Sequence, residues 1–262
     1  MAERRYLFVS GCPRSGTTMI TTLLNWSDDA FVAQERYAPL LRRDPDALVP
    51  SLFRAERLLD FRRGECGYAS FQAKREYTYQ VANPKDFDAL DRYPVIGDKI
   101  THLFRRFELF GTPAWRDEDV TIVHVVRGLE GVAASYLARQ RNADDKWEWG
   151  VDDALRDWTD AVECAHAYHQ DAGRGTRLVL VDYDWMHGGD ANRVMAVAGR
   201  LFEAVGLPFG SGQRVGAGRL IRMHGLLPRK PPLEAAVRER LVQSVDAGTR
   251  AKHEALRSWS IR

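Results

Sequence analysis

Apolar residues along the chain fall into two alternating patterns. Short runs rich in β-branched residues, each ending at glycine or charge, are typical of buried parallel strands. We expect these strands at Tyr6–Ser10, Ala30–Ala33, Val95–Ile96, Val120–Val126 and Arg177–Val181. The segments between them repeat apolar residues at helical spacing, and a Gly-Leu-Pro stop follows the last one. We expect these helices at Thr17–Trp26, Leu129–Gln140, Asp152–Ala172 and Asn192–Val205.

Strands that alternate with helices predict an α/β fold, in which helices flank a doubly wound parallel β-sheet. The 262 residues, 45% of them hydrophobic, are enough for the core of a single domain over 1–262. Ligands of such folds bind beyond the carboxyl ends of the strands. Residues that directly follow a predicted strand are therefore the first candidates for a site.

Two segments break the alternation. Residues 40–93 combine mixed charge, aromatic residues and several prolines and glycines, which indicates an inserted, mostly helical segment or lid. Residues 206–232 are rich in glycine and arginine, and we expect them to be irregular. The amphipathic segment Leu233–Val245 that follows packs either on the core or on a second subunit of a homodimer, and the pattern leaves this choice open.

The charge balance limits the choice of partners. Lys and Arg number 38 against 36 Asp and Glu, a net charge of +2, so no broad field attracts nucleic acid or a membrane. No apolar run approaches the ~20 residues of an integral membrane span or resembles a signal-peptide core. The 3 cysteines are far apart, which fits neither a disulfide framework nor a zinc site. We therefore expect a cytoplasmic protein with local anion sites.

The first strand leads into Gly11-Cys12-Pro13-Arg14-Ser15-Gly16-Thr17-Thr18 and then into a helix. Backbone amides of such a loop and the helix N-terminus converge on one point, where they attract a phosphate or sulfate. An ATP-binding loop has a lysine after its second glycine, but Thr17 stands there and Arg14 is the nearest cation. The alternatives are a ligand-free turn or a thiol site at Cys12, whose spacing matches thiol motifs poorly.

A second anion site is predicted from Arg127, which follows the strand Val120–Val126, and from Ser135 eight residues later. An arginine at the carboxyl end of a strand lies on the ligand side of the sheet, and a helical serine two turns on can face the same groove. Two separate anion sites on one sheet edge indicate a nucleotide with phosphates at both ends of its ribose.

These residues resemble those of the sulfotransferases that use 3′-phosphoadenosine 5′-phosphosulfate (PAPS), particularly bacterial and carbohydrate-type members with a P-loop-like fold. The loop Cys12-Pro13-Arg14-Ser15-Gly16-Thr17-Thr18 is similar to the family's 5′-phosphosulfate loop, and Arg127 with Ser135 to its 3′-phosphate motif. The stretch from Val179 to Asp184, which includes Tyr183, resembles a further strand and acidic corner. The resemblance implies PAPS as donor, the product PAP (3′-phosphoadenosine 5′-phosphate), and no required metal, which accounts for the missing lysine.

The chain departs from the family at two places. Lys99-Ile100-Thr101-His102 is one residue longer than the lysine-threonine-histidine strand end of the soluble small-molecule members. Arg229-Lys230 is only loosely similar to their basic-glycine motif. The resemblance implies that these two residues bind the adenosine end of the donor, and it leaves that end partly unassigned.

The transfer itself requires a base that takes a proton from the acceptor. The first candidate is Glu35, directly after a predicted strand where many carbohydrate and bacterial members have their catalytic glutamate; His102 is the second. Arg14 would offset charge on the leaving group, and Lys99 would assist. The expected acceptor is a small molecule, a sugar or a lipid-linked sugar that receives the sulfuryl group on a hydroxyl or, less readily, on an amine. Residues 40–93 are expected to contribute to its site.

Two other functions remain open from the sequence. A P-loop kinase would use Asp182, at the end of the last strand, to hold magnesium with ATP. A non-catalytic nucleotide-binding domain would keep the anion sites without turnover. Among the tryptophans, Trp158 is expected in the core, whereas Trp147 and Trp149 fit an acceptor pocket or the core equally well.

Overall fold

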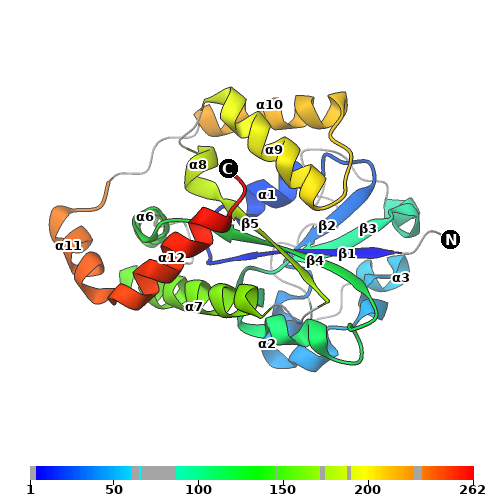
Figure 1. Ribbon diagram of the computed structural model, residues 1–262, viewed down its shortest axis with the longest axis horizontal. Helices are drawn as coiled ribbons and strands as arrows, with labels where there is room; N and C mark the ends of the chain where they lie inside the picture. Colours follow the sequence, from blue (N-terminus) through cyan, green and yellow to red (C-terminus); the bar gives the residue numbers. More distant parts are fainter. Residues whose placement is uncertain are drawn as a thin grey trace.

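The protein was analysed as a computed structural model that describes residues 4–60, 65, 87–144, 147–171, 175–187, 190–226 and 232–262. In these residues a five-stranded parallel sheet has the order β2-β3-β1-β4-β5 (Figure 1). Its strands are β1 (Arg5–Gly11), β2 (Ala30–Gln34), β3 (Val95–Lys99), β4 (Asp119–Val126) and β5 (Arg177–Asp182). Each coincides with a predicted strand, which confirms the doubly wound α/β fold.

Strand β3 runs three residues beyond its predicted end at Ile96, because Gly97, Asp98 and Lys99 are buried as well. A Cβ on Gly97 would lie 1.8 Å from the carbonyl oxygen of Leu7 in β1, so only glycine permits this close approach of the two strands. The apolar pattern could not show this, since two of the three residues are charged.

Helices cover both faces of the sheet (Figure 1). Along β1, Leu7 and Val9 belong to the apolar cluster on one face, and Tyr6 and Phe8 to the cluster on the other. The first face carries α1 (Thr17–Leu24), α8 (Tyr183–His187), α9 (Ala191–Ala204) and α10 (Ser211–Leu226). The second carries α2 (Ala38–Arg43), α6 (Leu129–Gln140), α7 (Val151–Gln170), α11 (Ala235–Ser244) and α12 (Ala247–Trp259), with the 3₁₀ segment η4 (Thr101–Gly111).

The expectation that residues 206–232 are irregular is wrong for most of the segment, because Ser211–Leu226 form α10. One of its glycines has a packing reason: a Cβ on Gly216 would lie 2.1 Å from the indole ring of Trp26. Glycine there lets the helix lie directly on this ring, and the gain in packing outweighs the low helix propensity of glycine.

The segment predicted as an insertion consists, where it is described, of short helical pieces. These are η1 (Pro45–Ala47), η2 (Pro50–Phe53), α3 (Ala55–Leu58) and η3 (Phe87–Arg92), while 61–64 and 66–86 lie outside the described residues. Helix α11, which the sequence left between core and subunit interface, contributes Leu241 to the apolar core of its own chain. Leu233 and Val245 at either side join the same cluster.

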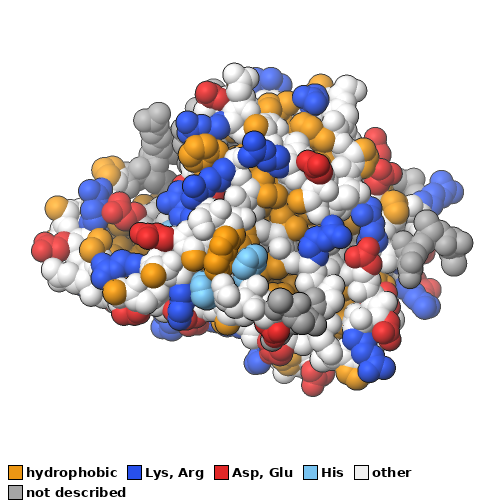
Figure 2. Space-filling view, viewed as in Figure 1, with side chains coloured by type: hydrophobic (Ala, Val, Ile, Leu, Met, Phe, Trp, Pro, Cys, Tyr) orange, Lys and Arg blue, Asp and Glu red, His pale blue; other side chains and the backbone are white. Residues whose placement is uncertain are grey.

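Charges of both signs are interspersed on the face of the molecule seen in Figure 2, in keeping with the net charge of +2. Among the helices of the described residues, none combines the length and the apolar composition that crossing a membrane requires.

Candidate active site

The loop between β1 and α1 is a tight turn that depends on its two glycines. Gly11 has a φ angle of 153°, Arg14 of 69° and Gly16 of 101°. A Cβ on Gly16 would lie 2.1 Å from the ring of Tyr183, and one on Gly11 would lie 2.7 Å from Ser15 Oγ. The amide of Ser15 donates to the carbonyl of Cys12 at 3.0 Å and closes the turn. The loop then enters α1, whose first amides are available to an anion.

The buried hydroxyl of Ser15 indicates an anion site in the loop. Ser15 is fully buried, and its Oγ has no hydrogen-bond partner within the described part of the chain. A buried hydroxyl without a partner is costly, and a phosphate oxygen held by the loop would satisfy it. Thr17 is also buried, whereas Thr18 is exposed.

The thiol of Cys12 has no such role. Its side chain is buried in the apolar core, and burial raises the pKa of Cys12 well above its ordinary value. A protonated, inaccessible thiol does not support the thiol-site alternative. Cys12 and the buried Pro13 therefore contribute to the loop through their backbone.

Arg127 follows β4 and reaches the loop. Its Nη1 donates to the carbonyl of Arg14 at 2.7 Å, and its guanidinium lies 4.8 Å from the centre of the Tyr183 ring. Asp184 lies 3.6 Å from Arg127 Nε and accepts a hydrogen bond from the amide of Gly128 at 2.7 Å. The indole of Trp158 donates to the carbonyl of Arg127 at 2.8 Å. Arg127 is therefore held on both sides at the end of its strand.

Arg14 connects the two predicted anion sites. Its Nε donates to Ser135 Oγ at 3.1 Å, although Ser135 was assigned to the second site from its spacing to Arg127. Ser135 is fully buried on α6. Arg14, Arg127 and Ser135 thus form one polar cluster, in which Arg14 extends toward the second site and its backbone belongs to the first.

Glu35 and Lys99 form an ion pair at the ends of β2 and β3. Lys99 Nζ lies 2.6 Å from Glu35 Oε1, and the Lys99 side chain is only 5% exposed against 37% for Glu35. Burial alone would raise the pKa of Glu35, but the charge and hydrogen bond of Lys99 outweigh it, so the pKa lies below its ordinary value. Glu35 is therefore an ionised carboxylate, partly open to solvent.

His102 lies in the first turn of η4 and is paired with a different carboxylate. Its Nε2 is 3.4 Å from Asp157 Oδ2 on α7, and the same oxygen accepts a hydrogen bond from Tyr136 at 2.7 Å. Burial would raise the pKa of Asp157, but the hydrogen bonds from His102 and Tyr136 lower it overall. The structure thus gives His102 a carboxylate partner that the sequence analysis did not find.

The roles of Asp157 and Asp184 were also not predicted from the sequence. Asp184 stands in the motif that suggested Tyr183, and its position one residue after Tyr183 was the available signal. Asp157 had no signal, because one acidic residue in a helix usually faces solvent.

Trp158 lies in the core as expected, Trp149 is 48% exposed, and Trp147 packs on Tyr136 with ring centres 5.1 Å apart. Arg229 and Lys230 lie outside the described residues.

Asp182, the magnesium ligand of the kinase alternative, is fully buried and held by arginines. Its Oδ2 lies 2.9 Å from Arg257 Nε and 3.4 Å from Arg262 Nε, and its Oδ1 accepts a hydrogen bond from the amide of Trp185. Asp182 therefore joins the C-terminal segment to β5. Within the described residues, no group of three or more His, Cys, Asp and Glu side chains is placed to hold a metal ion.

The sheet order brings the candidate residues together. Strand β1 is central, with β3 and then β2 on one side and β4 and then β5 on the other. All pairs are parallel, so their carboxyl ends share one edge. At that edge the loop lies in the middle, the Glu35–Lys99 pair on one side, and Arg127 with Tyr183 on the other. This is where ligands bind in open α/β sheets.

Comparison with known proteins identifies the family of the chain. The sequence model of the sulfotransferase family matches residues 7–210. The chain belongs to the sulfotransferase family. The match spans nearly the whole sheet and the candidate residues from Cys12 to Asp184, whereas Arg229 and Lys230 lie beyond it, and the protein is a sulfotransferase by descent and by fold. Comparison with curated protein sequences gives no significant match.

Solved sulfotransferase structures share the fold at low sequence identity. The sulfotransferase domain of the Synechococcus PCC 7002 olefin synthase matches with a TM-score of 0.53 and 15% identity, over 98% of this chain and 94% of that one. A sulfotransferase from Alicyclobacillus acidocaldarius gives 0.53 and 14%, over 97% and 95% of the two chains. Sulfotransferase STF9 from Mycobacterium avium gives 0.52 and 15%, over 100% and 78%.

Proposed function

We propose that this sulfotransferase moves a sulfuryl group from PAPS to a hydroxyl group of a small molecule, a sugar or a lipid-linked sugar, by in-line displacement. One observation carries the proposal. The anion-binding loop and the Arg127–Ser135 site are joined through Arg14, at the same sheet edge as an ionised carboxylate paired with a lysine. A donor with phosphates on both ends of its ribose and an acceptor that must lose a proton fit this arrangement.

The residues present fit such a donor. Loop amides with Ser15, Gly16, Thr17 and Thr18 would hold the 5′-phosphosulfate, and the unpartnered hydroxyl of Ser15 supports this assignment. Arg127 and Ser135 would hold the 3′-phosphate, with Tyr183 beside the ribose or base. Arg229 and Lys230 would bind the adenosine end of the donor, as the resemblance implies. When bound, PAPS supplies an activated sulfuryl group whose leaving group is PAP.

The side chains of the site then have separate tasks. Glu35 accepts the acceptor proton, and its lowered pKa keeps it unprotonated near neutral pH. Lys99 holds the carboxylate and would offset negative charge that develops during transfer. Arg14 offsets charge on the leaving phosphate. These residues supply position and charge, so the proposed chemistry requires no metal ion.

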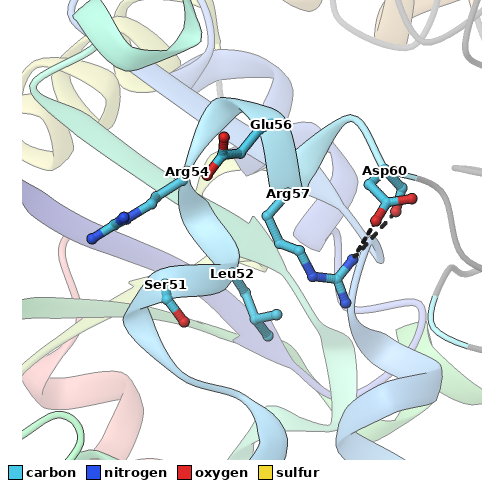
Figure 3. Close-up of a pocket in the computed structure, with 6 residues that line it drawn as sticks. All are labelled: Ser51, Leu52, Arg54, Glu56, Arg57 and Asp60. Carbon is cyan, nitrogen blue, oxygen red and sulfur yellow. Dashed lines mark hydrogen bonds and ion pairs between the residues drawn. The ribbon is translucent and has the colours of Figure 1, made fainter.

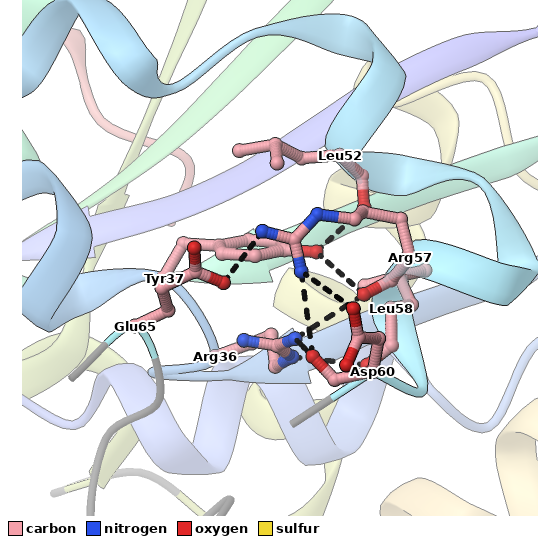
Figure 4. A network of polar contacts seen from close by, with 7 residues as sticks. All are labelled: Arg36, Tyr37, Leu52, Arg57, Leu58, Asp60 and Glu65. Carbon is pink, nitrogen blue, oxygen red and sulfur yellow. Dashed lines mark hydrogen bonds and ion pairs between the residues drawn. The ribbon is translucent and has the colours of Figure 1, made fainter. Parts of the chain in front are cut away.

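The segment predicted as an insertion is joined to the base. Arg36, directly after Glu35, donates to the carbonyls of Leu58 at 2.9 Å and Asp60 at 2.6 Å (Figure 4). The Tyr37 hydroxyl donates to the carbonyl of Leu52 at 2.6 Å. Leu52 and Asp60 also line a cavity of about 420 Å³ with Ser51, Arg54, Glu56 and Arg57 (Figure 3). These contacts of residues 51–60 support the proposal that the segment predicted as an insertion contributes to the acceptor site.

The donor is tested by turnover. The protein is incubated with PAPS, a panel of hydroxyl and amine acceptors, and EDTA, and PAP release is followed with transfer of the sulfuryl group. The proposal expects acceptor-dependent PAP release that survives the chelator. Release of ADP from magnesium-ATP with the same acceptors, and no turnover of PAPS, would contradict it.

The base is tested with Glu35→Gln. Loss of the general base is expected to reduce kcat about 10²–10⁴-fold with little change in PAP affinity. Glu163→Gln is the matched control, because Glu163 on α7 also pairs with a lysine, Lys252, but away from the loop. His102→Ala separates the second candidate: if it abolishes turnover while Glu35→Gln does not, His102 is the base.

A further inference from the structure

The backbone at Glu35 has an unusual conformation. Its φ angle is 58°, in the left-handed region that residues with a side chain rarely adopt. Outside glycine, the described residues show a positive φ only here and at Arg14 in the anion-binding loop. Such a conformation persists only where neighbouring contacts impose it.

Asp98 supplies those contacts. Its Oδ1 accepts a hydrogen bond from the amide of Arg36 at 3.1 Å, and its Oδ2 accepts one from the amide of Tyr37 at 2.8 Å. Asp98 is fully buried in β3. Both of its oxygens therefore bind the two amides that follow Glu35.

The neighbour of Asp98 holds Glu35 itself. The carbonyl of Lys99 accepts a hydrogen bond from the amide of Glu35 at 2.8 Å, and Lys99 Nζ binds its carboxylate. Residues 98 and 99 of β3 thus fix the backbone before and after the turn, as well as the side chain at its apex.

Holding two backbone amides with a buried carboxylate costs desolvation free energy. Burial raises the pKa of Asp98 to about 7, even though the two amides and Lys99 act in the opposite direction. A neutral side chain of the same size would avoid this cost but could not present two acceptor oxygens. The use of aspartate therefore points to a need for both hydrogen bonds.

We propose that Asp98 is a positioning residue for the base: its carboxylate locks the turn Glu35–Tyr37, so that Glu35 is directed at the acceptor. This inference rests on the proposed function, in which Glu35 is the base. Asp98 is fully buried and acts through the backbone amides that it holds.

Asp98→Asn tests the proposal, because the amide keeps the volume but replaces one acceptor oxygen with a donor. We expect kcat to fall about 10–100-fold per folded molecule, with the KM for PAPS and the Kd for PAP within about 2-fold of the parent protein. Asp98→Ser, which is smaller and neutral, is the second variant in case the first does not fold. An unchanged kcat in a folded variant would overturn the proposal.

Asn25→Asp is the matched control for general damage to β2. Asn25 is fully buried at the end of α1. Its Nδ2 donates to the carbonyl of Val32 in β2 at 2.8 Å, and its Oδ1 accepts a hydrogen bond from the amide of Val32 at 2.8 Å. If Asn25→Asp lowers kcat per folded molecule as much as Asp98→Asn does, the effect is structural and the proposal fails.

A double-mutant cycle with Glu35→Gln separates this inference from the proposed function. If Asp98 acts through Glu35, Asp98→Asn has little further effect on kcat once Glu35 is glutamine. An equal loss in both backgrounds overturns the positioning role while Glu35 stays the base. Near-normal turnover of Glu35→Gln alone overturns the base assignment, and the inference with it.

Discussion

At the scale of single residues, the pairing of Glu35 with Lys99 sets the protonation state of the proposed base. Two opposed influences meet at this carboxylate, since burial favours its neutral form and the lysine its charged form. The lysine prevails. The ammonium group of Lys99 therefore keeps the carboxylate ionised and available to accept a proton, although it also lowers the affinity of the carboxylate for that proton.

Lys99→Met is therefore expected to raise the pKa of Glu35, because burial then acts with less opposition. The acid limb of the pH–kcat profile should move to higher pH, alongside a fall in the maximum rate. Lys252→Met, which removes the lysine from the Glu163 pair, serves as control and should leave the profile in place. An unshifted acid limb in Lys99→Met would show that another group limits the rate at low pH.

The buried carboxylate of Asp98 gives a prediction for stability. Its pKa is raised from 3.8 to about 7 in the folded protein, so the folded state holds this proton more tightly than the unfolded state does. The resulting stability is fully present below pH ~4 and is lost as pH rises through about 7, by an amount on the order of 4 kcal/mol.

Denaturant unfolding at pH 5, 6, 7 and 8 measures this dependence. The difference between the parent protein and Asp98→Asn isolates the contribution of this group, because all other titrations are shared. We expect the parent protein to lose stability relative to Asp98→Asn as the pH rises. A constant difference between the two proteins would show that Asp98 keeps an ordinary pKa when folded.

At the scale of elements, the turn between β1 and α1 depends on the absence of a side chain at Gly16. Its φ of 101° and the Tyr183 ring at 2.1 Å from an added Cβ leave no room for one. Gly16→Ala should therefore displace either the loop or Tyr183 and weaken PAP binding at least 10-fold, by calorimetry.

Gly212→Ala is the matched control, because Gly212 lies in the first turn of α10 and an added Cβ there meets no atom within 4 Å. This exchange should leave PAP affinity unchanged and improve stability slightly through helix propensity. Equal PAP affinity in Gly16→Ala and the parent protein would remove the loop from the donor site.

The elements were predictable where one signal dominates. Apolar, β-branched runs located all five strands, and the glycine spacing located the loop. The end of β3 and helix α10 were missed because tertiary packing decides them. The charged residues Asp98 and Lys99 are buried within β3, and Gly216 lets α10 pack directly on the Trp26 ring. The same reason hid Asp98 and Asp157, whose partners come from distant parts of the chain and leave no trace in local spacing.

At the scale of the whole molecule, the C-terminal segment is held to the sheet by a buried charge. Arg257 on α12 pairs with Asp182 of β5 at 2.9 Å, and the Ile261 amide donates to the Leu180 carbonyl at 2.9 Å. Arg257→Met leaves the buried carboxylate with weaker compensation, and we expect a loss of about 2–3 kcal/mol in unfolding free energy.

Arg250→Met on the same helix is the control, since the Arg250 guanidinium is exposed and donates to a backbone carbonyl, that of Val242, rather than to a buried carboxylate. Its cost should stay near ~0.5 kcal/mol. If Arg257→Met costs no more than this, the buried pair does not anchor the C-terminal segment.

The order of the strands also determines how the candidate residues are arranged along one edge of the sheet. A central β1 places the loop between the Glu35–Lys99 pair and Arg127 with Ser135, an arrangement that fits the proposed donor and acceptor at one edge of the sheet. In the proposed function, residues 40–93 determine the identity of the acceptor.

The most direct test of the account is calorimetric titration of the protein with PAP, compared with ATP and magnesium under the same conditions. The account predicts PAP binding with a micromolar or lower Kd, little response to magnesium-ATP, and loss of PAP binding in Arg127→Ala. Tight binding of magnesium-ATP without binding of PAP would contradict the proposed donor, and with it the roles assigned to the loop, Arg127 and Ser135.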